Sequence, residues 1–360
     1  MRVLALLLSL ALVQPRTLSL PPTRDQFLAL FGGYVEALRV QAGIPGLAGV
    51  IVGDTPDPLW AQSFGLRDIS APDGNTRTDT PFHLDGLTQI FTATLVLQCL
   101  DRGRLTLDSR LGSYTPSSPD ANATIGQILS HTSGSPGNLT FSYDTKRFDQ
   151  LRFVVETCMA TKFRVAMRGL LDGLAMTDSV PGPDAADPGL SPLELTTPAQ
   201  TSQYLNVLGR LATPYSVSAS GQATPSRYPA TTLGGASGLI STVLDFAKFD
   251  SELRRPQSTL LSAGTLAQAW SNPPANSNGQ TLPHGLGWFV QTYNGEPVVW
   301  QYGIGPGASS SLVITLPSPN RNITLILLAN SDGLAMPATL SLGDVTVSPF
   351  ARMFLGLVVK

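Results

Sequence analysis

Apolar residues recur along this chain with two different periods, and each period predicts one kind of element. Between residues 23 and 42 they return every three or four positions, as on one face of a helix. Apolar runs of strand length, bounded by Gly, Pro, Asn or Asp, occur in two groups, at 47–52 and 59–64 and then at 287–293, 297–302, 309–316 and 323–330. A last apolar helix is predicted at 347–359.

The middle of the chain has a different pattern. Helical spacing of apolar residues predicts a long apolar helix at 91–100 and further helices at 126–129, 148–159, 163–171 and 200–211. The stretch 180–231 is otherwise rich in Pro, Ser, Thr and Ala and reads as a looped segment that wraps over a core. Strands at both ends and helices between them predict one split α/β lobe, about 24–85 and 282–360, with a helical insertion at about 86–281.

The N-terminus has the pattern of a secretory signal. Met1 and Arg2 precede an apolar run at 3–13, which Gln14 and Pro15 end. This predicts a signal peptide within residues 1–20, with the cleavage point open, and a secreted or periplasmic protein. An N-terminal core helix is the alternative interpretation. The run is too short to span a bilayer, so no transmembrane span is expected in the mature chain.

Composition excludes some partners and leaves the cysteines open. The 360 residues are 42% hydrophobic, only 13% charged, and carry a formal net charge of −2. Without a run of Lys and Arg, the chain has no electrostatic basis for binding nucleic acid or an anionic membrane. Cys99 and Cys158 are the only cysteines, and both lie in helix-like apolar stretches. Two buried free thiols are therefore expected, although export would permit a disulfide.

Several separate segments, in order along the chain, resemble one family of serine hydrolases. The segment 82–93 (FHLDGLTQIFTA) has the form of its strand-to-helix junction, and 125–134 (IGQILSHTSG) resembles its "LLTHTSG" turn. Further similar segments lie at 44–48, 64–68, 174–179, 238–249, 285–288 and 328–332. Together they are similar to class C β-lactamases, D-alanyl-D-alanine carboxypeptidases and related esterases. The resemblance implies a β-lactamase/transpeptidase-like α/β (α+β) fold, in which an antiparallel sheet is flanked by the terminal helices and carries an inserted helical subdomain.

The catalytic motifs of that family are degenerate here. The resemblance implies a nucleophilic serine with a lysine three residues later, but Gly86 and Gln89 stand at these positions. The second motif, Tyr-x-Asn, keeps Tyr143 and has Thr145 in place of the asparagine. The third motif, Lys-Thr-Gly or His-x-Gly, falls at 301–303, where Gln301 replaces the cation and Gly303 remains. Serine needs an adjacent base to attack an acyl carbonyl, so the expected chemistry is missing.

No displaced motif replaces what is lost. The four lysines are preceded, three positions earlier, by Tyr, Met, Asp and Leu, so Ser-x-x-Lys occurs nowhere. The three histidines have no metal-site spacing, and no cofactor or metal is expected. His131 belongs to a turn that is usually structural in the family. His83 is interpreted as structural or at the rim of the site, and His284 as a loop residue.

Three functions remain open from the sequence. The first is an inactive member of the family whose relic cleft binds a small-molecule or peptide-like ligand or a partner, with Tyr143, Gln89, Gln301 and Tyr302 lining it. The second is an esterase or amidase with a rearranged site around Tyr143 and a nearby serine, such as Ser133 or Ser142. The third is a structural or oligomer-forming scaffold; the sequence sets no oligomeric state.

Overall fold

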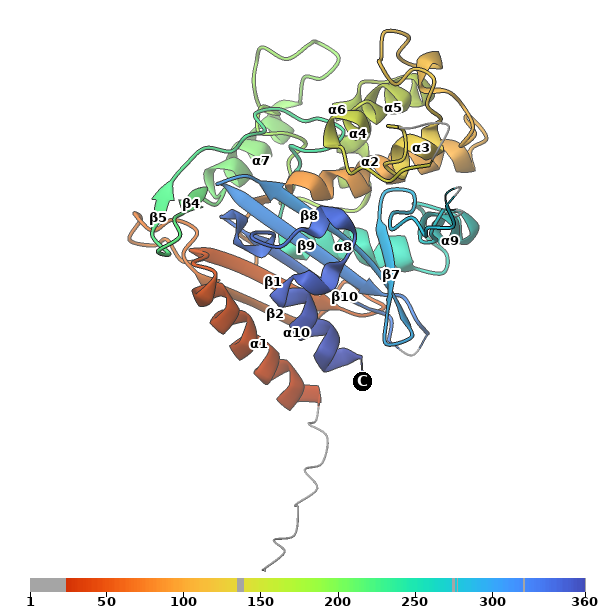
Figure 1. Ribbon diagram of the computed structural model, residues 1–360. Helices are drawn as coiled ribbons and strands as arrows, with labels where there is room; N and C mark the ends of the chain where they lie inside the picture. The colour runs from red at the N-terminus through yellow and green to blue at the C-terminus, as the bar shows by residue number, and fades with distance from the viewer. Residues whose placement is uncertain (1–23, 135–138, 274–275, 277, 320, 360) are drawn as a thin grey trace, which may run out of the picture.

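An antiparallel sheet of six strands forms the centre of the structure (Figure 1). The computed structural model describes residues 24–134, 139–273, 276, 278–319 and 321–359. The strands lie in the order β2-β1-β10-β9-β8-β7, so the first two strands of the chain join the last one. Their bounds are Pro58–Gly65 (β2), Gly46–Val52 (β1), Ile323–Ala329 (β10), Ser309–Leu316 (β9), Glu296–Gly305 (β8) and Phe289–Tyr293 (β7). All six predicted strands are confirmed, with ends that differ by a few residues.

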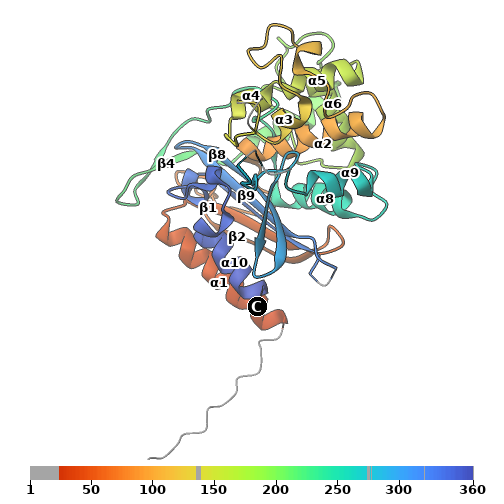
Figure 2. The same cartoon turned by 45° about the vertical axis from the view of Figure 1, so that its right-hand side comes forward.

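Each central strand is apolar on both faces because helices cover both. On β10, Leu325 and Leu327 face one apolar core, whereas Ile326 and Leu328 face the other. The first core lies against α1 (Arg24–Gln41) and α10 (Pro349–Val358), which run side by side in both views (Figures 1 and 2). These are the terminal helices that the sequence predicted.

The helical layer covers the opposite face. It contains α2 (Thr88–Asp101), α3 (Ile125–Leu129), α4 (Thr145–Asp149), α5 (Leu151–Met159), α6 (Phe163–Gly173), α7 (Pro198–Gly209), α8 (Val243–Arg254) and α9 (Ala263–Ala269). Two small sheets join β3 (Phe82–His83) with β6 (Ile240–Ser241) and β4 (Tyr215–Val217) with β5 (Ala223–Pro225). The predicted division into a lobe and an insertion stays a prediction.

Helices α8 and α9 and the small sheets were not predicted. On α8 the side chains of Asp250 and Arg254 are buried as an ion pair of 2.8 Å, with 6% and 2% of each side chain exposed. Two buried charges interrupt the apolar stripe from which a helix is recognised in a sequence. The pair is satisfied further by Asn322 and Thr324, at the start of β10. This polar contact therefore holds α8 against the sheet.

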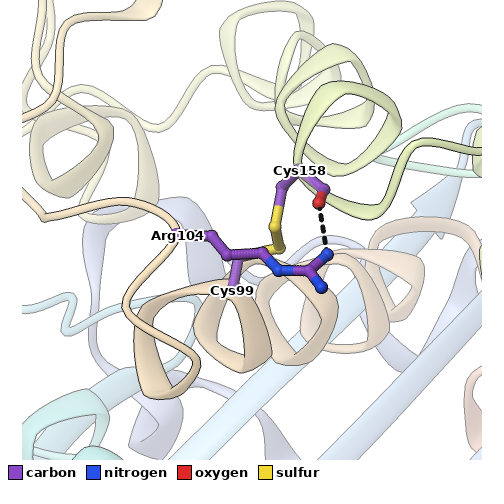
Figure 3. Close-up of a disulfide and its surroundings, with 3 residues drawn as sticks. All are labelled: Cys99, Arg104 and Cys158. Atoms are coloured by element: carbon purple, nitrogen blue, oxygen red, sulfur yellow. Dashed lines mark hydrogen bonds between the residues drawn. A yellow bond between two sulfur atoms is a disulfide. The ribbon is translucent and has the colours of Figure 1, made fainter.

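The prediction of two free thiols is wrong. Cys99 on α2 and Cys158 on α5 form a disulfide, with their Cα atoms 6.3 Å apart (Figure 3). Both cysteines lie on apolar helices, as predicted, but the packing of α2 against α5 brings them together. Arg104 donates a hydrogen bond to the carbonyl of Cys158 beside the bridge (2.7 Å). A bridge between residues 59 positions apart is worth roughly 4 kcal/mol in the chain-entropy account.

The ends of the chain limit what the fold says about location. Residues 1–23 lie outside the described residues, so the signal peptide stays a prediction. Among the helices that the structure describes, none combines the length and apolar character needed to cross a bilayer.

Candidate functional site

The degenerate motifs meet where the polypeptide passes from β3 into α2. A short 3₁₀ turn, Asp85–Leu87, connects the two elements, and its backbone packs against β8 and β9. Ser311 Oγ on β9 donates to the carbonyl of Leu84 (2.7 Å), and Ser309 Oγ donates to Asp85 Oδ2 (2.6 Å). Asp85 itself has a φ of +47°, a conformation that Asp tolerates better than most residues. The junction is therefore fixed by the sheet on one side and by α2 on the other.

Gly86 has no side chain and no room for one. A Cβ atom at this position would lie 2.6 Å from the Tyr302 carbonyl oxygen and 3.2 Å from the Gly303 Cα. A Cβ atom on Gly303 would in turn lie 2.3 Å from the Leu84 carbonyl oxygen and 2.7 Å from the Gly86 nitrogen. The two motif glycines thus pack backbone against backbone. A serine at position 86 would require β8 to move.

Gln89 takes part in a neutral hydrogen-bond chain in place of the expected lysine. The backbone N–H of Asp144 donates to His131 Nδ1 (3.1 Å), which assigns the ring proton to Nε2. His131 Nε2 then donates to Gln89 Oε1 (3.1 Å), and Gln89 Nε2 donates to the Tyr143 hydroxyl (2.7 Å). The Tyr143 oxygen accepts this bond and keeps its own proton for another acceptor.

Burial keeps His131 and Tyr143, the two ionisable residues of this hydrogen-bond chain, electrically neutral. It lowers the pKa of His131 well below the usual value, and the neighbouring His284 lowers it further. Burial raises the pKa of Tyr143 well above 10, and Tyr302 adds to this shift. Tyr143 is therefore protonated at neutral pH and is a hydrogen-bond donor rather than a base.

His284 and Gln301 form a second neutral pair beside the first chain. Gln301 Nε2 lies 3.3 Å from His284 Nε2 and 3.3 Å from the Gly287 carbonyl, while its Oε1 accepts from the Tyr302 N–H (2.9 Å). The rings of His284 and His131 meet edge to face, with centroids 4.7 Å apart. Burial lowers the pKa of His284 to about 3. The sequence placed His284 in a loop but gave no sign of this buried contact.

A cavity of about 430 Å³ opens on the other side of the junction. Gly86, Tyr143 and Thr145, which stand at positions of the family's motifs, line it together with Tyr302. The rest of its lining, which the sequence did not predict, comprises Asp85, Lys146, Asp149, Pro229, Ala230, Ala236, Ser237, Ile304 and Pro306. Three of the positions that match the family's motifs therefore share one cavity.

Several predicted residues lie outside this cavity. Gln301 is fully buried and points from β8 toward the helical layer, so the expectation that it lines the cleft is wrong. Gln89 is also fully buried, and its contact with a lining residue is the hydrogen bond to Tyr143. Gly303 packs against the backbone of Gly86 and does not line the cavity. Neither Ser133 nor Ser142 lines the cavity. The reason for Gln301 is the alternation of side chains along a strand, which sends its neighbour Tyr302 to the opposite face.

Asp85 is the lining residue with the least favourable surroundings for a charge. The residue is 2% exposed, and burial raises its pKa to about 7, against a smaller opposite effect of the Ser309 hydrogen bond. The sequence did contain a sign of this site: Asp85 is an acidic residue within the otherwise apolar strand-to-helix junction.

His83 lies two residues earlier on β3 and is also fully buried. Its ring stacks on Tyr228, with centroids 3.9 Å apart, and neither ring nitrogen has a hydrogen-bond partner among the described residues. Burial lowers its pKa to about 4. No group of three or more His, Cys, Asp or Glu side chains in the described part of the chain is arranged to hold a metal ion.

Comparison with known proteins gives a consistent match. A family model described as Beta-lactamase matches residues 31–341. Penicillin-binding protein 4* of Bacillus subtilis (strain 168) is 22% identical over 315 residues, which cover 79% of this chain and 68% of that protein. Penicillin-binding protein 4 of Amycolatopsis lactamdurans is 35% identical over 130 residues, 34% of this chain and 33% of that protein.

A third relative is a named hydrolase. Unguisins hydrolase ungD' of Aspergillus campestris (strain IBT 28561) is 23% identical over 332 residues, which cover 80% of this chain and 59% of that protein. The matches to this hydrolase and to the Amycolatopsis protein thus span less than two thirds of those relatives.

Solved structures show the same fold. The octameric penicillin-binding protein homologue from Pyrococcus abyssi superposes with a TM-score of 0.73 at 16% identity, covering 92% of this chain and 78% of that one. A crystal structure of SurE gives 0.67 at 21% identity, with 92% and 75% covered. At these identities the likeness supports the fold alone.

Proposed function

The chain belongs to the beta-lactamase family, and we propose that it is a catalytically inactive member whose cleft binds a ligand. The observation that carries the proposal is Gly86, where the nucleophile is absent and the Tyr302 carbonyl occupies the space of a Cβ atom. Removing the serine of an acyl-transfer site alone costs about 10⁶ in turnover. In this protein a Gly86→Ser substitution would not simply restore the nucleophile, because the Tyr302 carbonyl lies too close to a side chain at this position.

The groups around Gly86 support the same conclusion. Gln89 cannot accept a proton in the role of the missing lysine, and both of its amide atoms are already used by His131 and Tyr143. Tyr143 is the only one of the expected proton-transfer groups to remain, and its raised pKa keeps it protonated. An acyl-transfer step would therefore lack a nucleophile and a base at the positions where the family has them.

The cavity supports binding. Its volume of about 430 Å³ lies within the range of roughly 300–1,000 Å³ typical of ligand pockets. Apolar and aromatic residues, including Tyr302, Ile304 and Pro306, form much of the lining, and Tyr143 supplies a hydroxyl donor. A small-molecule or peptide-like ligand fits such a lining.

Covalent labelling tests inactivity directly. Purified wild type is incubated with a fluorescent penicillin and, separately, with a fluorophosphonate, alongside a catalytically active penicillin-binding protein as a positive control. We expect no covalent label on the wild type under conditions that saturate the control. The Gly86→Ser/Gln89→Lys double variant should also remain unlabelled, because a side chain at position 86 meets the Tyr302 carbonyl.

A labelled wild type would overturn the proposal. Peptide mapping would then identify the acylated residue, with Ser237 as the serine that lines the cavity and Ser133 and Ser142 as the candidates from the sequence analysis. Such a result would favour the hydrolase alternative. If the wild type is unlabelled and a thermal-shift screen of peptides and acyl compounds also gives no stabilisation, a scaffold role would replace binding.

An extracytoplasmic location is part of the proposal. The Cys99–Cys158 disulfide supports it, because such bridges persist in oxidising compartments, and the apolar run at 3–13 is consistent with export. N-terminal sequencing of the protein after expression with its own leader tests this. A secreted product that begins after the apolar run is expected, and an uncleaved protein retained in the cytoplasm would contradict it.

A further inference from the structure

One wall of the cavity carries a buried acceptor that the inactive-site proposal leaves unused. Asp85 precedes Gly86, is 98% buried and lines the cavity. Ser309 Oγ satisfies Oδ2 at 2.6 Å, but no described residue donates a hydrogen bond to Oδ1. A buried carboxyl group is costly to ionise without a charged or hydrogen-bonding partner, so such groups are normally paired or coordinated.

The remaining charges of the cavity do not compensate Asp85. Asp149 Oδ1 accepts from the Gly235 N–H (2.7 Å), and its Oδ2 lies 3.3 Å from Arg152 Nε, so this carboxylate already has partners. Lys146 is exposed and forms no ion pair within the described part of the chain. Asp85 is therefore the buried carboxyl group of the lining that has no cationic partner among the residues that the structure describes, and its Oδ1 lies close to Gly305 on β8.

The substitutions at the family's motif positions also remove positive charge from the surroundings of Asp85. The third motif has Gln301 where the resemblance implies a cation, and Gln301 faces the helical layer instead of the cavity. Gln89 also replaces a cation. A cavity whose buried ionisable group is a carboxyl, and whose neighbouring motif positions 89 and 301 carry neutral glutamines, is suited to cations more than to carboxylate-bearing ligands.

We propose that the ligand of this cleft presents a protonated primary amine to Asp85 Oδ1, with an aromatic or apolar group against Tyr143 and Tyr302. This inference rests on the proposed function and names the chemical class of its ligand. The planes of the Tyr143 and Tyr302 rings are inclined at 28° with centroids 5.4 Å apart, and the two rings offer an apolar surface in the same cavity as Asp85. Aromatic faces also attract a nearby ammonium group.

The groups that surround Asp85 leave it as the one that titrates near neutral pH. Tyr228, Tyr143 and Tyr302 have raised pKa values, that of Tyr302 being about 12, whereas the pKa of His83 is about 4. Asp85 has a pKa of about 7. Amine binding needs the ionised carboxylate, so affinity should rise by roughly tenfold between pH 6 and pH 8.

The experiment uses three aromatic probes of similar shape and different charge. Benzylamine, benzyl alcohol and benzoate are titrated into the full-length protein at pH 8, with binding followed by calorimetry and by ligand-observed NMR. We expect benzylamine to bind at least about tenfold more tightly than either other probe. Asp85→Asn should weaken benzylamine by about tenfold and leave benzyl alcohol unchanged, and it should abolish the dependence on pH.

Asp73→Asn is the matched control, because it makes the same chemical change at an exposed carboxylate that does not line the cavity. It should leave benzylamine affinity within about twofold. Equal binding of benzylamine to wild type and Asp85→Asn, or a preference for benzoate, would overturn the inference while leaving a ligand-binding cleft. Absence of binding by all three probes would overturn it as well. Penicillin labelling would instead overturn inactivity, which these titrations do not measure.

Discussion

The two sides of the β3–α2 junction differ in how they treat charge. On the side of the helical layer, the buried floor formed by Gln89, His131, His284 and Gln301 is neutral, and its polar groups are hydrogen-bonded to one another. On the cavity side, Asp85 is buried with one oxygen unpaired. A neutral and paired network needs no ligand, whereas the buried Asp85 carboxyl, once ionised, is stabilised by a cationic partner. The junction has thus become scaffold on one side and remains a cleft on the other.

Lowering the pH should have the largest effect on stability, because the buried histidines and Asp85 change the free energy of unfolding in opposite directions. The folded pKa values of His83 and His284, about 4 and about 3, lie below the unfolded value of 6.5, as does that of His131. The unfolded chain therefore binds more protons below pH 6.5, and the free energy of unfolding should fall as pH falls toward 4. The total loss should be on the order of several kcal/mol, measured by urea unfolding between pH 7.5 and 4.5.

Asp85 should act in the opposite direction. Its folded pKa of about 7 lies above the unfolded value of 3.8, so its protonated form stabilises the fold at low pH and that contribution is lost between about pH 4 and 7. Asp85→Asn should therefore make the acid loss steeper, and His284→Gln should make it shallower. If the free energy of unfolding depends on pH equally steeply in both variants, Asp85 and the buried histidines do not act in opposite directions.

A charge placed in the floor should have the next largest effect. Gln89→Lys puts an ammonium group beside neutral His131 and protonated Tyr143, with no carboxylate in the hydrogen-bond chain. We expect a loss of about 3 kcal/mol in the free energy of unfolding at pH 7. Gln89→Met, which is neutral and of similar size, should lose about 1–2 kcal/mol. If the lysine variant is the more stable of the two, the floor tolerates charge and its neutrality is not a structural requirement.

The smallest effect concerns the space at the nucleophile position. Gly86→Ala should cost about 1–3 kcal/mol, because its Cβ meets the Tyr302 carbonyl oxygen at 2.6 Å. Gly169→Ala is the matched control: Gly169 lies on α6, a Cβ atom there would meet nothing within 4 Å, and its replacement should stabilise by about 0.5–1 kcal/mol. Thermal unfolding of the two variants measures the difference. A Gly86→Ala protein as stable as wild type would show that position 86 is open to a side chain.

Much of the fold was predictable because it rests on local periodicity. The six strands, the terminal helices and the buried helix α2 follow from runs and spacings of apolar residues. The loss of serine and lysine was visible as single letters at positions 86 and 89. The pairing of Cys99 with Cys158 was not, because the sequence placed each on a helix without showing which helices pack together.

The candidate site was predictable only in part for a similar reason. Gly86, Tyr143 and Thr145, all at motif positions, line the cavity, but Gln301 does not, because its place on β8 turns it toward the helices. His284 had no motif, and its role depends on contacts with Gln301 and His131.

The sequence by itself determined the family fold and the absence of the catalytic serine and lysine. Only the tertiary structure decided that Gly86 has no space for a side chain, that the floor is neutral and paired, and that Asp85 is buried with a free oxygen. The physical reason is that side-chain type and period are local properties of the chain. Space, pairing and the pKa of a carboxyl depend on groups up to more than two hundred residues away, such as Ser309 for Asp85, that meet only on folding.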